Sequence, residues 1–578
     1  MFTAGLSRTE KGLLAAIALL VSCAFFVARR IDVDYYDCYD LYGNARALLA
    51  GDRGLYYGVR PALGSVLLVP FLVLQDRLFG GNFAFRSTHL AVPAFYAGTL
   101  LFFYKMLRVS VRREEALWAV ALLAANPLMI RMSVSVKEDL PGLFFTAAAF
   151  YYLAILERDG KTRSRIGACL GAAAAVSLRY FLLPLFAGAH LAAAAVRAAW
   201  GRRSAANRVL DLVWIVALPL ALFAAVPILV NWIGFKASGP AHAAGMFVDD
   251  LRSIRNEHWP AEPASQNLSF LVKACTAPGM ALFLFGLFTR FRDREDGAPI
   301  FFAWLLVAAI ILNYGVPHKE ARYLLPLLPP FYYFAAGGFA GILRGVSSRF
   351  GKSAVPAGVA AFVLLALPAA AAAETAGIFQ EPLYRQGFHR PASLYAAALA
   401  GEGQIHWYGN LYPVHPRNYL FHPKDDTAFI YHFFTQAVRF YTGRDVRLVR
   451  DESSLSKLRK GDVLILNPDP VFYDSSNVPA SPKPLSIGKV KSVTLMPPAF
   501  ATINGYHWIE SDGYDSDLDI FVIRGDGKIP NGEVVSRSPR MTARFEAGRF
   551  EGNADVKVVV VVAYAERRFF SNPGDRKA

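Results

Sequence analysis

Long apolar runs fill the chain as far as about residue 375, and they constrain its fold more than any other feature. A membrane-spanning helix needs about 20 apolar residues, and about 17 suffice when the helix is short. Helices are required because lipid offers the backbone no hydrogen-bond partners. The candidate runs are 12–28, 62–79, 88–104, 116–130, 140–156, 166–182, 183–196, 209–232, 268–289, 299–313, 323–343 and 354–373. The pattern predicts a polytopic α-helical membrane protein over residues 1–375 and a separate water-soluble domain over residues 376–578.

Composition agrees with this prediction. Hydrophobic residues make up 54% of the chain and charged residues 18%, whereas soluble domains carry about 25% charged residues. The composition excludes disordered and collagen-like chains, because apolar residues are too plentiful. The net charge of +16 is explained by basic cytoplasmic loops, so we expect no nucleic-acid partner. The four cysteines show no spacing typical of disulfides or metal sites.

The charge of the loops sets the predicted topology. Five loops between the runs are basic and should be cytoplasmic. Their basic residues are Lys105, Arg108, Arg112 and Arg113; Arg158, Lys161, Arg163 and Arg165; Arg197, Arg202, Arg203 and Arg208; Arg290, Arg292 and Arg294; and Arg344, Arg349 and Lys352. With a cytoplasmic N-terminus, all five are inside only if 62–79 does not cross. We therefore predict about eleven spans, with 62–79 as an interfacial or re-entrant helix in the outer loop 31–87 and the C-terminal domain outside.

Two short helices must then occupy 166–196, because basic loops flank this stretch on both sides. The turn between them faces outward and carries Arg179. Three other polar segments also reach the outer side: 31–40, 136–141 and 317–323. Ionisable residues at membrane level are costly and are functional hypotheses by default.

The first two segments are acidic. Asp34 and Asp37 follow the first span, and a carboxylate at the edge of the hydrocarbon can act as a proton acceptor. Arg60, further along the same loop, could bind a phosphate through two hydrogen bonds, or its side chain could simply reach the lipid headgroups. Glu138 and Asp139 stand where a span begins, and helix capping could explain one of these two carboxylates.

The third segment places His318, Lys319, Glu320 and Arg322 between two apolar runs. Carboxylates facing basic side chains at one membrane surface suit a single task. A carboxylate deprotonates a nucleophile, and the cations stabilise a phosphate leaving group. A phosphate at that depth would belong to a lipid.

The segment His318–Tyr323 resembles the HKExRF signature of dolichyl-phosphate-mannose-dependent mannosyltransferases, with Tyr323 in place of the phenylalanine. These enzymes belong to the GT-C superfamily of membrane glycosyltransferases. The stretch Tyr57–Leu63 resembles a Lys-Pro-Pro-Leu stretch of bacterial protein O-mannosyltransferases and aminoarabinose transferases, with Arg60 in place of the lysine. The acidic first loop and Lys137–Asp139 are similar in placement to the superfamily's two acidic motifs. The resemblance covers residues 10–375.

The resemblance implies inverting transfer of a sugar from a polyprenyl phosphate to an acceptor hydroxyl at the outer face of the cytoplasmic (inner) membrane. The sugar would be a hexose such as mannose, and the acceptor a glycan, a lipid or a protein. Asp34 is expected to be the base, with Asp37 as its rival. Glu138 and Asp139 would orient the acceptor or hold a divalent cation. Arg60, His318, Lys319 and Arg322 would bind the donor phosphate, with Glu320 and Arg179 in support.

Two other functions remain open. A transporter or lipid flippase would use the same polar residues as a substrate path, although we find no internal repeat of the kind that transporters show. An oligosaccharide ligase of similar architecture would take a larger donor.

The part beyond residue 375 reads as an extracytoplasmic α/β or α+β domain. Short apolar runs predict strands, and the stretch 427–441 has a helical period. The predicted strands are 404–408, 446–449, 462–466, 491–495, 518–523 and 556–563.

Overall fold

The structure is a computed structural model in which the chain forms two compact units. One comprises residues 1–31, 44–255 and 261–379, and the other comprises 32–43, 256–260 and 380–578. Not every residue is described. The described residues are 7–28, 36–51, 61–79, 90–200, 208–255, 263–316, 319–350, 397, 400–408, 442–444, 446–449, 462–466, 485–487, 490–493, 533–537, 541–545, 557–560 and 562–565.

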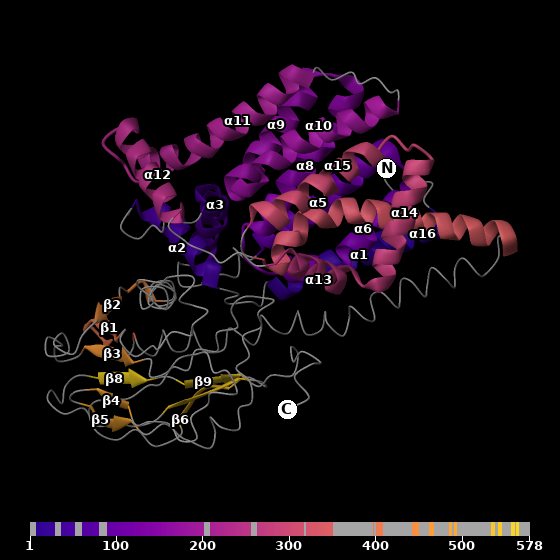
Figure 1. Ribbon diagram of the computed structural model, residues 1–578. Coiled ribbons are helices and arrows are strands. Elements are labelled where there is room, and N and C mark those ends of the chain that lie inside the picture. Colours follow the sequence, from indigo (N-terminus) through magenta and orange to yellow (C-terminus); the bar gives the residue numbers. More distant parts are fainter. Residues whose placement is uncertain are drawn as a thin grey trace. The chain divides into compact units, whose positions relative to one another are not determined.

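The first unit is helical (Figure 1). Its helices, with the adjoining α2, are α1 (Arg8–Ala28), α2 (Tyr36–Ala50), α3 (Ala62–Phe79), α5 (Ala91–Ser110), α6 (Arg113–Ala124), α7 (Pro127–Met132), α8 (Asp139–Asp159), α9 (Thr162–Leu178), α10 (Leu183–Ala199), α11 (Arg208–Leu229), α12 (Pro240–Arg255), α13 (Ala264–Cys275), α14 (Ala277–Arg292), α15 (Ala298–Ile310) and α16 (Leu328–Phe350). Short 3₁₀ helices, η2 (Tyr180–Leu182) and η5 (Ala321–Leu327), precede α10 and α16. Single π turns, η3 (Val230–Gly234) and η4 (Ile311–Gly315), extend α11 and α15.

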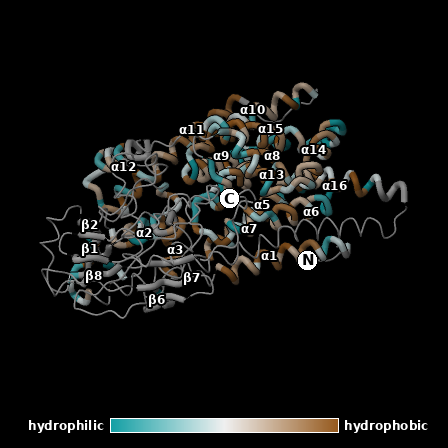
Figure 2. The backbone as a smooth tube through the Cα atoms, turned by 60° about the horizontal axis from the view of Figure 1, so that its bottom comes forward, coloured by the Kyte–Doolittle hydropathy of each residue, from teal (hydrophilic) through white to brown (hydrophobic). Residues whose placement is uncertain are grey.

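Apolar residues dominate these helices, as the hydropathy colouring of Figure 2 shows. Five helical stretches in the described part of the chain are long and apolar enough to cross a membrane: Thr9–Ala28, Asp139–Asp159, Tyr180–Ala199, Val209–Gly234 and Ala298–Gly315. The pair α13 and α14, bent by 99°, counts as a sixth if it forms one span. The chain is therefore a multi-pass membrane protein. The figure of eleven spans stays a prediction, and 354–373 lies outside the described residues.

Ion pairs gather the basic loops at one end of the helical unit. Ser7 and Glu10 form a capping box at the start of α1, and Glu10 also binds Arg113 in the first basic loop, at 2.5 Å. The other loops are tied together in the same way. The linking contacts are Arg290–Glu115, Arg197–Glu157, Arg165–Asp211 and Arg158–Asp296, and the charge of Arg344 acts on Glu115. All five basic loops thus lie at one end, as the charge pattern predicts.

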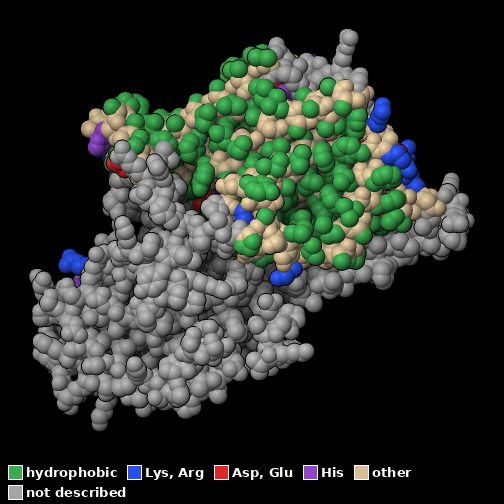
Figure 3. Space-filling view, viewed as in Figure 1, with side chains coloured by type: hydrophobic (Ala, Val, Ile, Leu, Met, Phe, Trp, Pro, Cys, Tyr) green, Lys and Arg blue, Asp and Glu red, His purple; other side chains and the backbone are tan. Residues whose placement is uncertain are grey.

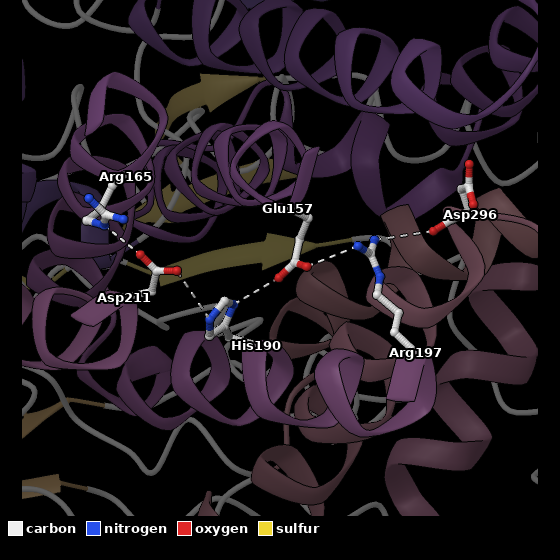
Figure 4. A network of polar contacts seen from close by, with 6 residues as sticks. All are labelled: Glu157, Arg165, His190, Arg197, Asp211 and Asp296. Carbon is white, nitrogen blue, oxygen red and sulfur yellow. Dashed lines mark hydrogen bonds and ion pairs between the residues drawn. The ribbon is translucent and has the colours of Figure 1, made fainter. Parts of the chain in front are cut away.

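Much of this end is held by the buried chain of contacts in Figure 4. His190 lies between two carboxylates, with its Nδ1 3.4 Å from Glu157 Oε1 and its Nε2 4.0 Å from Asp211 Oδ2. Arg165 Nε lies 2.5 Å from the other oxygen of Asp211, and Arg197 Nη1 lies 3.0 Å from Glu157. These contacts join α8, α9, α10 and α11. Lys and Arg side chains gather mainly along one edge of a hydrophobic face (Figure 3).

The position of α1 and α5 bears on the helix predicted not to cross. Glu10 and Arg113 place the start of α1 and the end of α5 at the basic end. At 1.5 Å per residue, Ala28 and Ala91 lie about 27 Å away toward the opposite end. The segment between them therefore leaves and returns at the same end, which supports a juxtamembrane α3.

Helices α9 and α10 appear in place of one long run, with Arg179 at the break. The predicted pair of short helices is thus present.

The second unit contains strands. Four parallel strands form a sheet in the order β2-β1-β3-β8, namely β1 (Ile405–Tyr408), β2 (Val446–Val449), β3 (Val463–Leu466) and β8 (Lys557–Val560). An antiparallel sheet has the order β6-β7-β9, from β6 (Glu533–Arg537), β7 (Met541–Phe545) and β9 (Val562–Ala565). The pair β4 (Leu485–Ile487) and β5 (Val490–Val493) completes the set of described strands.

Most predicted strands lie near these positions, but the run 556–563 is two strands in different sheets. Strands β4, β6 and β7 are not predicted from the sequence, because their short stretches lack a clear apolar run. The predicted strand 518–523 and helix 427–441 lie outside the described residues.

Candidate functional site

Two carboxylates open α8 at the end opposite the basic loops. Asp139 is its first residue and Glu138 is the N-cap, and the two residues are 6% and 1% exposed. The side chain of Glu138 makes no capping hydrogen bond. Both of its oxygens are buried without a hydrogen-bond partner. Capping therefore does not explain Glu138.

Arg179 supplies the first positive charge facing these carboxylates. It breaks the chain between α9 and η2, with extended backbone angles that end the helix. Its Nη2 atom lies 2.5 Å from Asp139 Oδ2 and 3.7 Å from Glu138 Oε2. The aligned geometry of a hydrogen bond is absent at Nη2, so the contact is an ion pair.

Arg322, at the start of η5, supplies the second positive charge. Its Nη2 donates to Glu320 Oε1 at 2.9 Å, and its Nε also contacts the second oxygen of Glu320. The same Nε lies 4.0 Å from Asp139 Oδ2. Segments far apart in the sequence therefore meet around Asp139.

The ring of Tyr323 joins the two arginines. The guanidinium carbons of Arg179 and Arg322 lie 5.6 Å and 5.4 Å from its centre. These distances suit cation–π attraction, which holds both cations close despite their mutual repulsion. Tyr323 is a contributor that the sequence analysis did not single out, although its aromatic position in the HKExRF-like segment was a usable signal.

Lys319 contacts the end of the helical segment that precedes it. Its ammonium donates to the carbonyl oxygens of Leu312 at 2.7 Å and Asn313 at 3.0 Å, and also to Val316. These carbonyls end the π turn that extends α15. The contacts are those of a helix C-cap.

The structure does not describe the side chains of the remaining predicted site residues. Asp34, Arg60 and His318 lie outside the described residues, and Asp37 is described only as backbone of α2. One turn after Asp37, Asp40 is buried, at 1% exposure. The roles assigned to the first loop therefore remain predictions.

The carboxylate–guanidinium cluster is formed by Glu138, Asp139, Arg179, Glu320 and Arg322. It is buried and contains three acids and two bases, and separating buried charges from water costs several kcal/mol per ion. Asp139 and Glu157 lie on the same helix, so this cluster is about 27 Å from the network at the basic end. Two polar sites thus occupy opposite ends of α8.

Comparison with known proteins identifies the architecture. A family model described as dolichyl-phosphate-mannose-protein mannosyltransferase matches residues 71–230. The crystal structure of ArnT from Cupriavidus metallidurans bound to undecaprenyl phosphate is similar, with a TM-score of 0.56 at 13% identity over 80% of this chain and 94% of that chain. The apo form of the same protein gives a TM-score of 0.54 at 14% identity, over 79% and 93%. The helical fold of this chain is therefore similar to that of ArnT, and residues 71–230 match a mannosyltransferase family model.

The GT-C resemblance seen in the sequence is therefore confirmed. Residues 71–230 include Glu138, Asp139 and Arg179 but neither the first acidic segment nor Arg322. A search of curated protein sequences returned no significant match.

Metal binding is a further question for a site with two adjacent carboxylates. In the described part of the chain, no group of three or more His, Cys, Asp and Glu side chains is arranged to hold a metal ion. Glu138 and Asp139 supply two carboxylates, and a guanidinium nitrogen already lies 2.5 Å from one of them. This donor set does not fit a divalent cation.

Proposed function

We propose that this GT-C protein transfers a sugar from a polyprenyl phosphate to an acceptor hydroxyl, with inversion at the anomeric carbon. The observation that carries the proposal is the buried carboxylate–guanidinium cluster at one end of a GT-C helical unit. Support also comes from the fold match to ArnT, whose crystal structure is described as bound to undecaprenyl phosphate.

In the proposed reaction, a first-loop carboxylate removes the proton of the acceptor hydroxyl. The oxygen attacks the anomeric carbon from the side opposite the lipid phosphate. The bond between carbon and phosphate oxygen breaks, and its electron pair leaves with the polyprenyl phosphate. We assign the base to Asp34, with Asp37 as the alternative, because a carboxylate at the membrane edge can accept a proton.

The cluster has two tasks in this reaction. Arg322, together with Arg60 and His318, would stabilise the negative charge that builds on the leaving phosphate. A guanidinium suits this role because it binds phosphate through two parallel hydrogen bonds. Glu320 would hold Arg322 in place, since it forms two contacts with that guanidinium.

The acceptor would be oriented by Glu138. Its two oxygens are buried without a hydrogen-bond partner, and a buried acceptor left unsatisfied costs about 1–3 kcal/mol. An incoming hydroxyl would satisfy one of them. Asp139, adjacent to Glu138, would anchor the arginines.

The finer features of the proposal follow the sequence analysis. The donor sugar would be a hexose, with mannose as the first to test. The reaction would occur at the outer face of the inner membrane, with a cytoplasmic N-terminus and an outer C-terminal domain. The acceptor would be a glycan, a lipid or a protein.

The test is a transfer assay with a polyprenyl-phosphate sugar and a panel of single variants of the purified protein. Asp34→Asn, Asp37→Asn, His318→Ala and Arg322→Gln are compared with Lys273→Met, a change at an exposed residue of α13. We expect the base variant and Arg322→Gln to lose 100-fold or more in kcat, as is typical for general bases and charge-stabilising donors. Full activity in all four variants would refute the assignment.

A further inference from the structure

We infer that Arg179 takes the place of a divalent cation in this protein, so that the site works without a metal. The inference deepens the proposed function and rests on it for its activity arm. Its starting point is the position of one atom. Arg179 Nη2 lies 2.5 Å from Asp139 Oδ2 and 3.7 Å from Glu138 Oε2.

The distance from this nitrogen to Asp139 is within the range of a metal–oxygen bond, and its distance to Glu138 is longer. Divalent cations such as Mg²⁺ and Ca²⁺ bind carboxylate oxygens at about 2.0–2.6 Å. A cation shared by Asp139 and Glu138 would be drawn to the region that the Arg179 guanidinium occupies, because Arg179 Nη2 faces one oxygen of each carboxylate. The guanidinium and the metal would therefore compete for one position.

Backbone hydrogen bonds and a neighbouring aromatic ring hold Arg179 in this position. The residue is fixed at the junction of α9 and η2, where Arg179 N donates to Ala175 O at 2.8 Å and Leu182 N donates to Arg179 O at 2.9 Å. Its guanidinium also faces the ring of Tyr323. Arg179 is therefore held both at its backbone and at its guanidinium, unlike the side chain of a mobile surface ion pair.

Charge balance points the same way. The carboxylate–guanidinium cluster has three acidic and two basic side chains, and Glu320 is already paired with Arg322. Arg179 then leaves Glu138 and Asp139 with one net negative charge between them. Without Arg179, Glu138 and Asp139 would keep only the more distant Arg322, whose Nε lies 4.0 Å from Asp139 Oδ2, and two buried carboxylates with so little compensating charge attract a divalent ion.

Arg179 therefore supplies a permanent positive charge at a position where a metal site would depend on an ion that can dissociate. An arginine is always protonated, so its charge is independent of pH and of metal supply. Replacing it with a neutral side chain should turn the position into a metal site, because the carboxylates of Glu138 and Asp139 then face it without the guanidinium.

Manganese binding tests this directly on the full-length protein in detergent. The probe is Mn²⁺, followed by the loss of its free electron paramagnetic resonance signal. Wild type and Arg179→Lys, which keeps the positive charge, should bind no Mn²⁺ at this site. Arg179→Gln should bind about one ion per chain, and the double variant Arg179→Gln/Glu138→Gln should lose that binding. Thermal unfolding confirms that each variant is folded.

The activity arm adds a second readout. Wild-type transfer should be unchanged by EDTA, whereas Arg179→Gln should be inactive in EDTA and gain at least tenfold with Mn²⁺. Wild type that binds Mn²⁺ stoichiometrically, in a manner abolished by Glu138→Gln, would overturn the inference. So would a folded Arg179→Gln that binds none. If wild type transfers no sugar at all, the proposed function fails, but the Mn²⁺ measurement still decides the inference.

Discussion

Lys319 illustrates at the scale of single residues how the same side chain can serve a ligand or the backbone. The HKExRF-like segment suggests that its ammonium binds phosphate. The structure has it donating to three carbonyls at the end of the π turn η4. Asn267 Nδ2 reaches the same turn, donating to Leu312 O at 3.1 Å and to Asn313 Oδ1 at 2.9 Å. A π turn leaves carbonyls without regular partners, and these two donors satisfy them.

Replacing Lys319 tests the capping role. Lys319→Met should lower the free energy of unfolding by about 1–3 kcal/mol, because buried carbonyls lose their donor. Lys273→Met, at an exposed position of α13, should change it by no more than about 0.5 kcal/mol. Thermal and denaturant unfolding in detergent measure both. A raised KM for the lipid donor with unchanged stability would instead assign Lys319 to the phosphate.

The second and third polar segments stand out in the sequence because charge inside an apolar run is a strong signal. The sequence predicts Glu138, Asp139, Arg179 and Arg322 as site residues, and the structure brings these four together. The partners themselves were not predictable. Which oxygen faces which guanidinium depends on the break after Leu178 and on the ring of Tyr323, and neither follows from spacing alone.

Helices α14 and α16 show, at the scale of elements, how small residues set a close crossing. A Cβ atom at Gly286 would overlap the carbonyl oxygen of Phe334, and one at Gly338 would overlap that of Leu282. The clash is with backbone on both sides, so no side-chain rotation relieves it. Membrane helices use glycines in this way to bring backbones together.

Alanine at this crossing should therefore destabilise the helical unit. Gly286→Ala and Gly338→Ala should each cost about 1–3 kcal/mol, the usual range for overpacking. Gly345→Ala on the same helix is the control, because a Cβ there meets nothing within 4 Å. Unfolding in detergent measures all three. Equal stability of the three variants would contradict the close crossing.

In the second unit, the parallel sheet contains a titratable pair. His406 on β1 lies with its Nε2 3.2 Å from Oδ2 of Asp462, which precedes β3. Burial lowers the pKa of His406 below its ordinary value, and the charge of Asp462 offsets only part of this effect. The unfolded chain, with a histidine pKa of about 6.5, therefore binds the proton more tightly than the folded sheet.

The sheet should lose stability in acid for this reason. The stability that the neutral His406 gives to the folded sheet is fully present above the unfolded pKa of about 6.5. It is lost as the pH falls through the lower pKa of the folded state. Amide hydrogen exchange of β1 in the full-length protein, at pH 7.5 and at pH 5.5, measures it. His406→Asn should show a smaller loss of protection than wild type over this interval. An identical loss in both proteins would show that His406 has no part in it.

The two ends of the helical unit differ in charge, as the pattern of basic loops predicts. Five basic loops meet at one end through ion pairs such as Arg113–Glu10 and Arg165–Asp211, and the carboxylate–guanidinium cluster occupies the other end of α8. The five loops were predictable because basic loops follow a strong rule. The contacts among the buried residues Glu157, His190 and Asp211 were not predictable, because a single charged residue in an apolar run does not reveal its partner.

Orientation in the membrane is tested by labelling single cysteines in a variant without the four native ones. A cysteine at Lys161 should react with an impermeant maleimide only after the membrane is opened. A cysteine at Tyr180, which is exposed at the other end, should react in intact cells. The reverse pattern would invert the topology and place the cluster in the cytoplasm.

The carboxylate–guanidinium cluster is proposed to serve sugar transfer rather than transport. Wild type and Glu138→Gln are reconstituted in liposomes with a labelled polyprenyl-phosphate sugar and a membrane extract that supplies acceptors, and free polyprenyl phosphate is measured. The account predicts that wild type releases polyprenyl phosphate as it glycosylates an acceptor and that Glu138→Gln is at least tenfold slower. Movement of the intact lipid-linked sugar between leaflets, without release of polyprenyl phosphate, would contradict it.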